Sequence, residues 1–377
     1  MRTRIHLLPH VDAPYRWSIR PLRYLAAWTI PLSAALSFRA TGGAAWLAIG
    51  YAFGFLPLLE LLLPGAPGNL GPQDRERVSH DPGYELVLWT AVPIQWGMLV
   101  FFLWKMAMDP ATGITWWGHV TAMGLLCGVL GINVAHELGH RPDAFSQFLA
   151  KLLLTTSLYT HFFVEHNRGH HRNVATPEDP ASARRGEWVY LFWVRSIIGG
   201  WRSAWRLEHK RLTRLGIPVM SLQNEVLRWQ AFQWSLLLGV GWGWGWNVAG
   251  AWAVAALLGG CLLETVNYIE HYGLERKREN AHRFERVQPH HSWNSDHALG
   301  RLVLFELSRH SDHHHQPAKS YAQLDHIERA PQLPTGYPGM MLLSLVPPVF
   351  FPVMRRKLTQ LERDLTCSEH PASEGNR

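Results

Sequence analysis

The histidines that could bind metal fall into three short clusters. The clusters span residues 136–140 (HELGH), 166–171 (HNRGHH) and 310–315 (HSDHHH). Histidine is the commonest metal ligand among side chains, and residues three or four apart share one face of a helix. Eight imidazoles at such spacings are too many for one zinc ion and about right for two transition-metal ions held side by side. They are His136, His140, His166, His170, His171, His310, His313 and His314.

A ninth candidate ligand is His271, in the stretch 267–274 (NYIEHYGL), where the last predicted membrane span ends. A lone histidine at such a place is usually interfacial, but its position and the family resemblance described below favour a ligand. His161 lies in an apolar run and fits a buried core histidine. For His290, His291 and His297, and for His315, which extends the third cluster, we expect supporting or structural roles rather than direct metal binding.

Six carboxylates lie near the clusters in sequence. Ligating histidines usually donate their second N–H to a carboxylate or a carbonyl, so each of the six could orient a ligand or bridge two metal ions. A solvated or helix-capping carboxylate is an equally good interpretation of each one alone. The six are Glu137, Glu165, Asp179, Glu270, Asp296 and Asp312.

Two other classes of protein could use some of these residues. The stretch 136–140 satisfies HExxH, the zinc metalloprotease signature, in which Glu137 would be the general base. A mononuclear protease needs only one further ligand, which leaves most of the other two clusters without a purpose. A metal transporter would carry its ligands within the membrane spans rather than at one face. Both classes therefore explain the sequence less well than a two-metal enzyme.

Composition indicates a membrane protein. Hydrophobic residues make up 47% of the 377 residues and charged residues only 17%, with 19 tryptophans, which favour membrane interfaces. The mean hydropathy of −0.08 averages apolar segments with Arg- and His-rich ones. Three cysteines, none in a CxxC pair, imply neither a disulfide framework nor a cysteine metal site. The net charge of +7 indicates basic loops on the cytoplasmic side rather than nucleic-acid binding.

Hydrophobic runs predict an all-α integral membrane protein with six spans, several of which approach the roughly 20 residues needed to cross the hydrocarbon. A further run, Phe145–Val164, is more polar, and we expect a helix buried in protein or lying at the interface. The six predicted spans are Tyr24–Phe38, Ala44–Pro64, Leu86–Met106, Thr115–Ala135, Gln230–Trp246 and Val248–Tyr268.

The loops predict the orientation. An arginine-rich arm, residues 1–23, precedes the first span without the compact apolar core of a cleaved signal, and the second loop carries Arg75 and Arg77. The positive-inside rule then places both termini and all the histidine clusters in the cytoplasm. We expect one hydroxylase-type domain over 24–365, a catalytic cap formed by 136–229 and 269–340, and a disordered tail over 366–377.

The motifs together resemble a known family. HELGH, EHNRGHH, NYIEHYGL and LSRHSDHHH are similar to those of the membrane alkane 1-monooxygenases, relatives of the fatty-acid desaturases and hydroxylases. The resemblance runs from about residue 56 to 338. Ser308, His315 and Arg141 depart from the family's usual glutamine, alanine and lysine. None of the three removes a proposed ligand, but they make fine substrate preference unsafe to transfer.

The resemblance implies a desaturase-like fold and a nonheme centre of two iron ions held by nine histidines, namely the eight above and His271. It implies O2-dependent oxidation of the terminal methyl of medium-chain n-alkanes to primary alcohols in the bacterial inner membrane. Rubredoxin, recharged by an NADH-linked rubredoxin reductase, would supply the electrons. A fatty-acyl desaturase or hydroxylase on the same scaffold is the alternative.

Terminal selectivity would need a narrow path that presents only the chain end. Candidate wall residues on the second span are Tyr51, Phe53, Phe55 and Leu59, although lipid-facing or packing roles explain them equally well.

A rubredoxin needs four cysteines for its iron, so this chain, with three, would need a separate electron donor. A basic patch could dock an acidic partner, or its arginines could lie near lipid headgroups. The candidate docking residues are Arg168, Arg172, Arg184, Arg185, Arg202 and Arg206.

Overall fold

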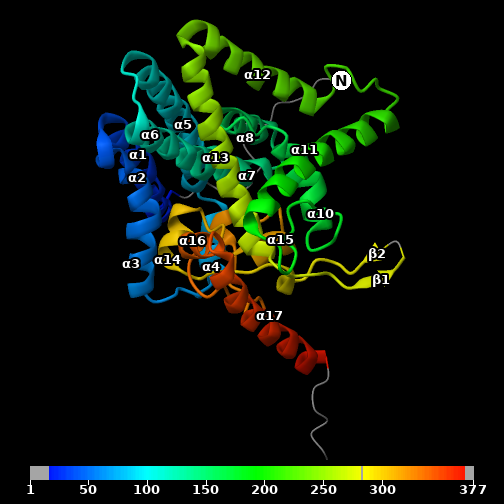
Figure 1. Ribbon diagram of the computed structural model, residues 1–377. Helices are drawn as coiled ribbons and strands as arrows, with labels where there is room; N and C mark the ends of the chain where they lie inside the picture. The colour runs from blue at the N-terminus through cyan, green and yellow to red at the C-terminus, as the bar shows by residue number, and fades with distance from the viewer. Residues whose placement is uncertain (1–16, 282, 370–377) are drawn as a thin grey trace, which may run out of the picture.

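The computed structural model describes residues 17–281 and 283–369, and they are mostly helical (Figure 1). This confirms the predicted helical class. The exception is a small antiparallel hairpin of β1 (Arg278–Asn280) and β2 (Arg283–Phe284), which an all-α prediction did not include.

Four helices are long and apolar enough to cross a membrane. They are Gly42–Leu62, α5 (Gly83–Met108), Gly113–Gly139 and α13 (Trp246–His271). These correspond to the second, third, fourth and sixth predicted spans. The first of them joins η2 (Gly42–Trp46), α2 (Leu47–Gly50), η3 (Tyr51–Phe55) and α3 (Leu56–Leu62). The third of them joins α6 (Gly113–Leu126), η4 (Cys127–Asn133) and α7 (Val134–Gly139).

The other two predicted spans are helical but are not among these four. The first corresponds to η1 (Arg20–Trp28), a 3₁₀ segment, followed by the short α1 (Thr29–Arg39). The fifth corresponds to α12 (Glu225–Trp244), whose first half carries charged and amide side chains that lower its hydropathy.

Two of these helices, Gly113–Gly139 and α13, approach each other through small residues. A Cβ placed on Gly259 of α13 would lie 2.4 Å from Cβ of Cys127, and one on Gly124 would lie 2.9 Å from Cβ of Leu258. Without side chains at these glycines, the backbones of α6 and α13 come together closely, as is common between membrane helices. This contact fixes the helix that carries the first histidine cluster against the helix that ends at His271.

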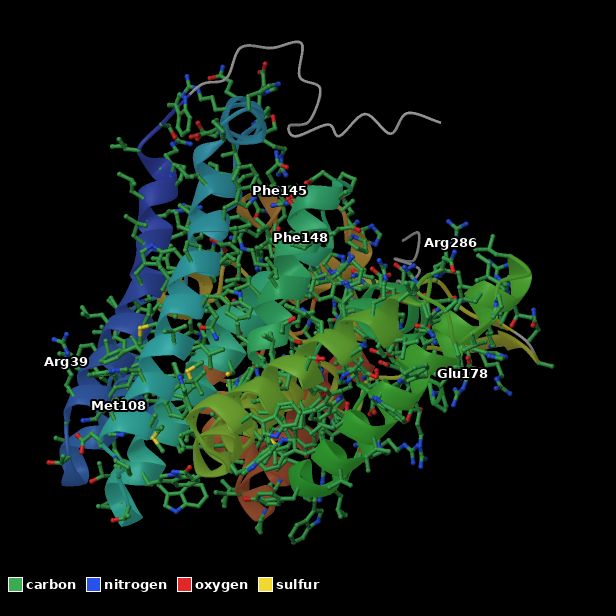
Figure 2. All side chains as sticks on the ribbon, turned by 90° about the horizontal axis from the view of Figure 1, so that it is seen from above. Arg39, Met108, Phe145, Phe148, Glu178 and Arg286 are labelled. Atoms are coloured by element: carbon green, nitrogen blue, oxygen red, sulfur yellow. The ribbon has the colours of Figure 1, made fainter. Side chains whose placement is uncertain are left out.

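Further helices, called the cap elements below, connect and surround these four. Figure 2 labels Arg39 and Met108, the ends of α1 and α5, at one end of the bundle and Phe145, at the start of α8, at the opposite end. The cap elements are α4 (Pro72–Ser79), α8 (Ala144–Thr156), α9 (Phe162–Glu165), η5 (His166–His170), α10 (His171–Asn173), α11 (Val189–Arg214), η6 (Pro289–His291), α14 (Ala298–Val303), α15 (His310–His315), η7 (Tyr321–Gln323) and α16 (Tyr337–Ser344).

The C-terminal helix α17 spans Pro347–Glu369. The prediction of a disordered tail from residue 366 is therefore wrong for its first four residues, which continue the helix; residues 370–377 lie outside the described part. The predicted buried or interfacial helix over Phe145–Val164 corresponds to α8 and the turn that leads into α9. The predicted arm overlaps the described residues only from Trp17 onward.

Candidate metal centre

The nine predicted ligands lie together as two adjacent groups. In each group the candidate ligand atoms all lie within 4.8 Å of one another. The residues of the two groups are up to 178 positions apart in the chain, from His136 to His314. The structure brings them together at one buried place near the C-terminal ends of α7 and α13. The first group, called the group of five, is His136, His140, His166, His171 and His313; the second, the group of four, is His170, His271, His310 and His314.

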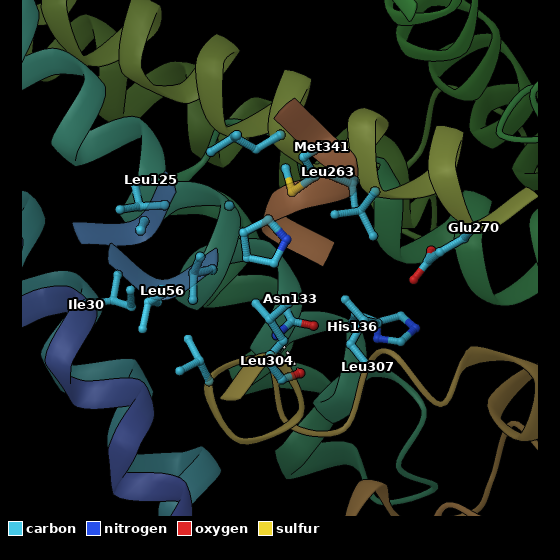
Figure 3. A pocket seen from close by; sticks show the side chains of 18 of the residues that line it. Ile30, Leu56, Leu125, Asn133, His136, Leu263, Glu270, Leu304, Leu307 and Met341 are labelled. Carbon is cyan, nitrogen blue, oxygen red and sulfur yellow. Dashed lines mark hydrogen bonds between the residues drawn. The ribbon is translucent and has the colours of Figure 1, made fainter. Parts of the chain in front are cut away.

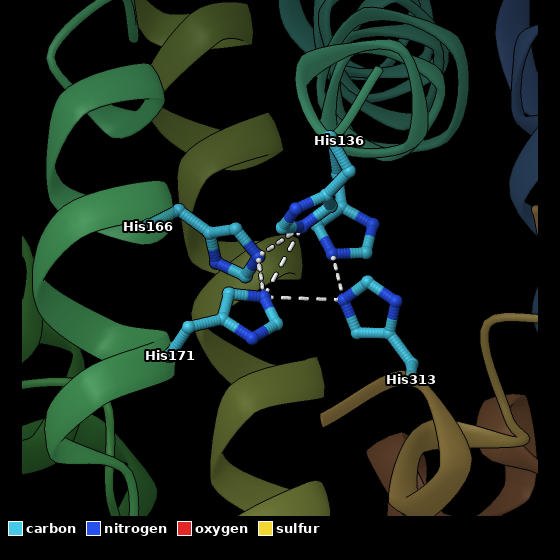
Figure 4. Close-up of side chains that lie close together, drawn as sticks. His136, His166, His171 and His313 are labelled. Atoms are coloured by element: carbon cyan, nitrogen blue, oxygen red, sulfur yellow. Dashed lines mark hydrogen bonds between the residues drawn. The ribbon is translucent and has the colours of Figure 1, made fainter. Parts of the chain in front are cut away.

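In the group of five, the Nε2 atoms converge on one point (Figure 4). The Nε2 atoms of His136 and His313 are 2.9 Å apart, and those of His171 and His313 are 3.2 Å apart. His166 lies 2.9 Å from His171 and 3.1 Å from His140, measured between the same atoms. The rings come from α7, from the π-helical turn η5 and the start of α10, and from α15.

In the group of four, Nε2 of His310 lies 3.2 Å from Nε2 of His271 and 2.9 Å from Nε2 of His314. The His170 ring faces both His271 and His314, at centroid distances of 5.0 and 4.9 Å. The Nε2 atom of His170 is buried and has no hydrogen-bond partner among the described residues.

These distances fit metal ions better than hydrogen bonds between the rings. Two metal–nitrogen bonds of about 2.1 Å at a right angle would separate their nitrogens by about 3.0 Å. A neutral imidazole has one N–H, so five mutually close ring nitrogens cannot all be paired as donor and acceptor. Burial, and then the neighbouring imidazoles, lower the pKa of His166, His171 and His313 well below the ordinary value. The rings are therefore neutral and keep lone pairs for a cation.

Asp179 lies where a carboxylate should lie if it orients a ligand. Its Oδ2 accepts a hydrogen bond from Nδ1 of His170 (2.9 Å) and another from the Ser182 hydroxyl (2.6 Å). Burial alone would lower the pKa of His170, but the charge of Asp179 and this hydrogen bond raise it above the ordinary value. Because Nδ1 carries the hydrogen, Nε2 is the atom that faces the group of four.

Glu270 also touches a ligand. Its Oε2 is 3.2 Å from Nε2 of His310, and its Oε1 accepts a hydrogen bond from the Tyr337 hydroxyl (2.8 Å). Glu270 is therefore the predicted carboxylate that comes closest to a ligating nitrogen.

Two groups that contact a candidate ligand or its carboxylate partner were not predicted from the sequence. The Tyr337 hydroxyl is one. The other is the backbone carbonyl of His291, which faces Nδ1 of His271 at 3.3 Å. A backbone oxygen has no signal in a sequence, and the only hint for Tyr337 was its place near the end of the stretch 56–338 over which the family resemblance runs.

Three predicted carboxylates lie elsewhere. Glu137 accepts from the backbone N–H of Tyr321 (2.9 Å) and pairs with Arg141 (3.0 Å). Asp296 pairs with His326 (2.9 Å) and Asp312 with Lys319 (2.6 Å). The hypothesis that they orient ligands is not supported for these three, because their contacts lead away from the nine imidazoles. For Glu137 and Asp312 the reason is that residues one or two apart on a helix point to different sides.

Glu165 is buried beside the centre but hydrogen-bonds to none of the nine imidazoles in the described part of the chain. It lines a small cavity with His161, His166 and Glu264. Burial, and then the charge of Asp179, raise the pKa of Glu165 to about 8. His161 is buried, as predicted for a core histidine.

The histidines expected to have supporting roles lie outside both groups. His290 and His291 form a further small cluster with Glu285. Nδ1 of His291 accepts the backbone N–H of Gln288 (2.9 Å), so Nε2 carries the hydrogen and the ring has no free lone pair for a metal. His297 contacts the Ser295 hydroxyl (2.9 Å), and His315 is exposed.

An apolar cavity ends at the candidate metal centre (Figure 3). His136, His166, His310 and Glu270 lie at the metal end, and Figure 3 shows Ile30, Leu56 and Leu125 at the other end. A large part of its wall comes from the cap, which the sequence analysis did not find. The cap residues in the wall are Leu299, Gly300, Val303, Leu304, Leu307, Pro338 and Met341.

Of the four predicted wall residues, Phe53 lines this cavity and Tyr51, Phe55 and Leu59 do not. The Tyr51 hydroxyl donates to the Thr29 hydroxyl (2.9 Å), and the Phe55 ring stacks on Tyr51 and is 55% exposed. Residues 51 and 55 are four apart and therefore share the outer face of the helix, away from residue 53.

The six predicted docking arginines do not line a single groove. Arg168 and Arg172 line an open groove together with Lys210, Arg211 and Arg214. Arg168 also pairs with Glu208 (3.0 Å) and Glu225 (2.9 Å). The other four lie outside this groove: Arg184 follows the Ser182 turn, Arg185 pairs with Glu362 of α17 (3.1 Å), and Arg202 and Arg206 are exposed on α11.

Comparisons with known proteins agree with this geometry. A sequence model of the fatty acid desaturase family matches residues 114–344. The alkane 1-monooxygenase of Pseudomonas putida is 39% identical over 316 residues, which cover 83% of this chain and 77% of that protein. Alkane 1-monooxygenase 1 of Alcanivorax borkumensis is 38% identical over 83% of this chain and 78% of its own length. Alkane 1-monooxygenase 2 of Pseudomonas aeruginosa is 40% identical over 83% and 84%.

Identity of this level over most of both chains, together with the family match, establishes relationship. The chain belongs to the fatty acid desaturase family, and within that family it groups with the alkane 1-monooxygenases.

Proposed function

We propose that this protein is an alkane 1-monooxygenase that converts the terminal methyl group of n-alkanes to a primary alcohol. The observation that carries the proposal is the joint placement of two imidazole groups at the end of an apolar cavity. Alkanes have no polar group to recognise, so a cavity lined by hydrocarbon side chains suits them. The relatives' names, alkane 1-monooxygenase, support the same reaction.

We propose iron as the metal, with one ion held by the group of five and one by the group of four. Iron can change its oxidation state and activate O2, whereas zinc cannot. The overall reaction takes one alkane, one O2, two electrons and two protons, and gives one alcohol and one water. Asp179 would orient His170, and Glu270, which lies beside the ligating nitrogen of His310, could offer a carboxylate oxygen to the same ion. The enclosed position of the nine rings keeps bulk water away from the reacting atoms.

Selectivity for the chain end follows from the cavity rather than from bond strength, because internal C–H bonds are weaker than terminal ones. Figure 3 shows His136 and Glu270 at one end of the cavity and Ile30 and Leu125 at the other. A chain that enters from the other end presents its methyl group first. Its remaining methylenes would lie against Leu304, Leu307 and the residues around Ile30.

We propose that α1 with η1, and α12, also cross the membrane, which gives six spans. The positions of Arg39 and Met108 at the same end of the bundle support this count, since each ends an outward crossing. Arginine-rich loops then place the metal centre, both termini and the cap on the cytoplasmic side of a bacterial inner membrane. Residues 24–365 would form a single hydroxylase domain with the cap made by 136–229 and 269–340.

The electron donor that we propose is rubredoxin, recharged by an NADH-linked rubredoxin reductase. The groove lined by Arg168, Arg172, Lys210, Arg211 and Arg214 is the best supported docking place, because η5 carries Arg168 and two metal ligands on one short turn. Arginine and lysine at the rim of a groove attract an acidic partner.

The zinc protease alternative is weakened by Glu137. A general base must face the metal, but both contacts of this carboxylate lead to Arg141 and to the backbone of Tyr321. The hypothesis of a metal transporter is weakened because all nine imidazole rings are enclosed together at one place near the helix ends.

The decisive experiment uses purified protein loaded with iron and reconstituted with its electron donors in lipid. It is fed octane in one reaction and a fatty acyl substrate of matched chain length in another, and the iron content is measured on the same sample. We expect 1-octanol and about two irons per chain. A desaturated or hydroxylated acyl product without 1-octanol would favour the desaturase or acyl-hydroxylase alternative, and one zinc per chain without alcohol would reject the proposal.

A further inference from the structure

Helix α11 has an outward face of unusual composition. Along its first four turns the exposed residues are large and apolar; after Trp201 the same face carries basic residues. Leu191 is 67% exposed and Val194 59%. The apolar residues are Tyr190, Leu191, Val194, Ile198 and Trp201, and the basic or titratable ones are Arg202, Arg206, His209, Lys210 and Arg214.

The opposite face of α11 is firmly held. Phe192 and Ser196 are buried, and Nε1 of Trp193 donates to the hydroxyl of Thr265 on α13 (3.0 Å). The outward apolar face is therefore not a loose surface that could rotate inward to be buried.

Helix α17 repeats this pattern beside α11. The Tyr190 hydroxyl donates to the backbone carbonyl of Leu345, which joins the starts of the two helices (2.7 Å). Around that junction Leu342, Val346 and Val349 are exposed, and about two turns later α17 exposes Arg355 and Arg356. The two helices start close together and diverge from there (Figure 1), and each changes from apolar to basic along its length.

The depth of this surface can be estimated along α13. Trp246 at the start of α13 is exposed and belongs to the run 241–246 of alternating glycine and tryptophan, which suits a membrane interface. At 1.5 Å per residue, Glu264 lies about 27 Å along the helix from Trp246, close to the roughly 30 Å thickness of the hydrocarbon layer. Ser196 of α11 donates to Glu264, so the apolar half of α11 lies beside the inner edge of that layer.

Four of the basic residues form no ion pair with the described residues. In the described part of the chain, Arg202, Arg206, Arg355 and Arg356 are all exposed, and none has a carboxylate within the 4.0 Å of an ion pair. Exposed guanidinium groups next to an apolar surface at this depth are suited to the phosphates of lipid headgroups.

We propose that the outward faces of α11 and α17 form a lipid-binding surface: Leu191, Val194, Ile198 and Val349 contact acyl chains, and the four arginines bind anionic headgroups. Helix α11, which belongs to the predicted cap over 136–229, is then partly inserted into the inner leaflet. Arg202 and Arg206 serve membrane attachment instead of donor docking, which separates them from the groove at Arg168 and Arg172.

The test is nitroxide accessibility in the reconstituted, iron-loaded protein. Single cysteines replace Leu191, Val194, Ile198 and Val349 in a C261S/C367S background, and H209C serves as the matched reference farther along α11. Collisions with O2 should exceed collisions with a water-soluble nickel chelate at the first four sites, with the reverse at position 209. Nickel accessibility at Leu191 and Val194 equal to that at 209 would overturn the proposal and leave this face available to a protein partner.

The proposed binding of anionic headgroups by the four arginines is tested by a separate measurement. Spin-labelled phosphatidylglycerol and phosphatidylcholine are compared for the fraction of lipid immobilised by the protein. The native chain should prefer phosphatidylglycerol by roughly two- to fivefold, and R202Q/R206Q and R355Q/R356Q should each reduce the preference. R214Q, on the same helix but in the groove with Arg168 and Arg172 and outside the four proposed headgroup ligands, is the control. A preference unchanged in both double variants would reject the arginines as headgroup ligands, whatever the enzymatic activity of the protein.

Discussion

Nδ1 of His170 donates a hydrogen bond to Oδ2 of Asp179 over 2.9 Å, and both side chains are almost fully enclosed. The next residue, His171, belongs to the other imidazole group. Two adjacent residues on one turn therefore belong to two different imidazole groups, and Asp179 fixes the direction of the first.

Replacing Asp179 by Asn should weaken metal binding in the group of four. The amide keeps the shape but loses the charge that orients His170, and such partners typically contribute 10–100-fold to metal affinity. We expect the iron content of D179N to fall towards one per chain and alcohol formation to fall with it, measured by metal analysis and by octane turnover. D296N is the control, since Asp296 contacts His326 instead, and it should keep its iron. Equal iron loss in both variants would contradict the role of Asp179.

His313 and His315 are two residues apart and provide a matched pair. His313 is buried in the group of five, whereas His315 is exposed. H313A should lose bound iron and alcohol formation, and H315A should retain most of both. Metal analysis of purified protein separates the two variants, and an H313A enzyme with full iron would remove His313 from the ligands.

Glu137 should matter for stability rather than for chemistry. It ties α7 to the backbone of Tyr321 and to Arg141, and losing one charge-assisted contact of this kind costs roughly 1–3 kcal/mol. E137Q should therefore melt at a lower temperature in thermal unfolding while it keeps its iron. If E137Q instead retained its melting temperature and lost the metal, Glu137 would belong to the metal site.

Phe53 and Phe55 test which face of the second span bounds the cavity. Phe53 lines it and Phe55 is exposed on the outside. F53A should enlarge the cavity and shift the preferred alkane to longer chains, because removing a ring leaves room for additional methylenes. F55A should leave the preference unchanged. Competition among alkanes of six to sixteen carbons, read by the ratio of the alcohols, measures the shift; an equal shift in both variants would contradict this assignment.

The groove at Arg172 and Arg214 should govern the encounter with the electron donor. R172Q/R214Q should raise the KM for rubredoxin several-fold and reduce its dependence on salt, with little change in kcat, because rim charges act mainly on association. R185Q is the control, since Arg185 pairs with Glu362 on another part of the surface. Steady-state kinetics at two salt concentrations measure both effects, and an unchanged KM would place docking elsewhere.

The sequence by itself determined which histidines are candidates and what kind of protein carries them. Histidines three or four residues apart predicted that their imidazoles share a helix face. The apolar runs predicted the four helices that are long enough to span a membrane. These patterns involve residues close together in the chain, so they can be recognised without knowing the fold. The two weaker spans were harder to judge, because a 3₁₀ start before α1 and a polar first half of α12 lower the signal.

Only the tertiary structure decided how the nine rings divide. His310 and His314 face one group and His313 the other, because successive positions on a helix point about 100° apart and the partners come from distant segments. The residues of the cap elements that line the cavity, such as Leu304 and Met341, could not be predicted either, because they are far in sequence from the rest of the lining. The sequence also could not show which carboxylates contact a candidate ligand. Asp179 and Glu270 do. Asp312 lies between two candidate ligands in the chain but pairs with Lys319 instead.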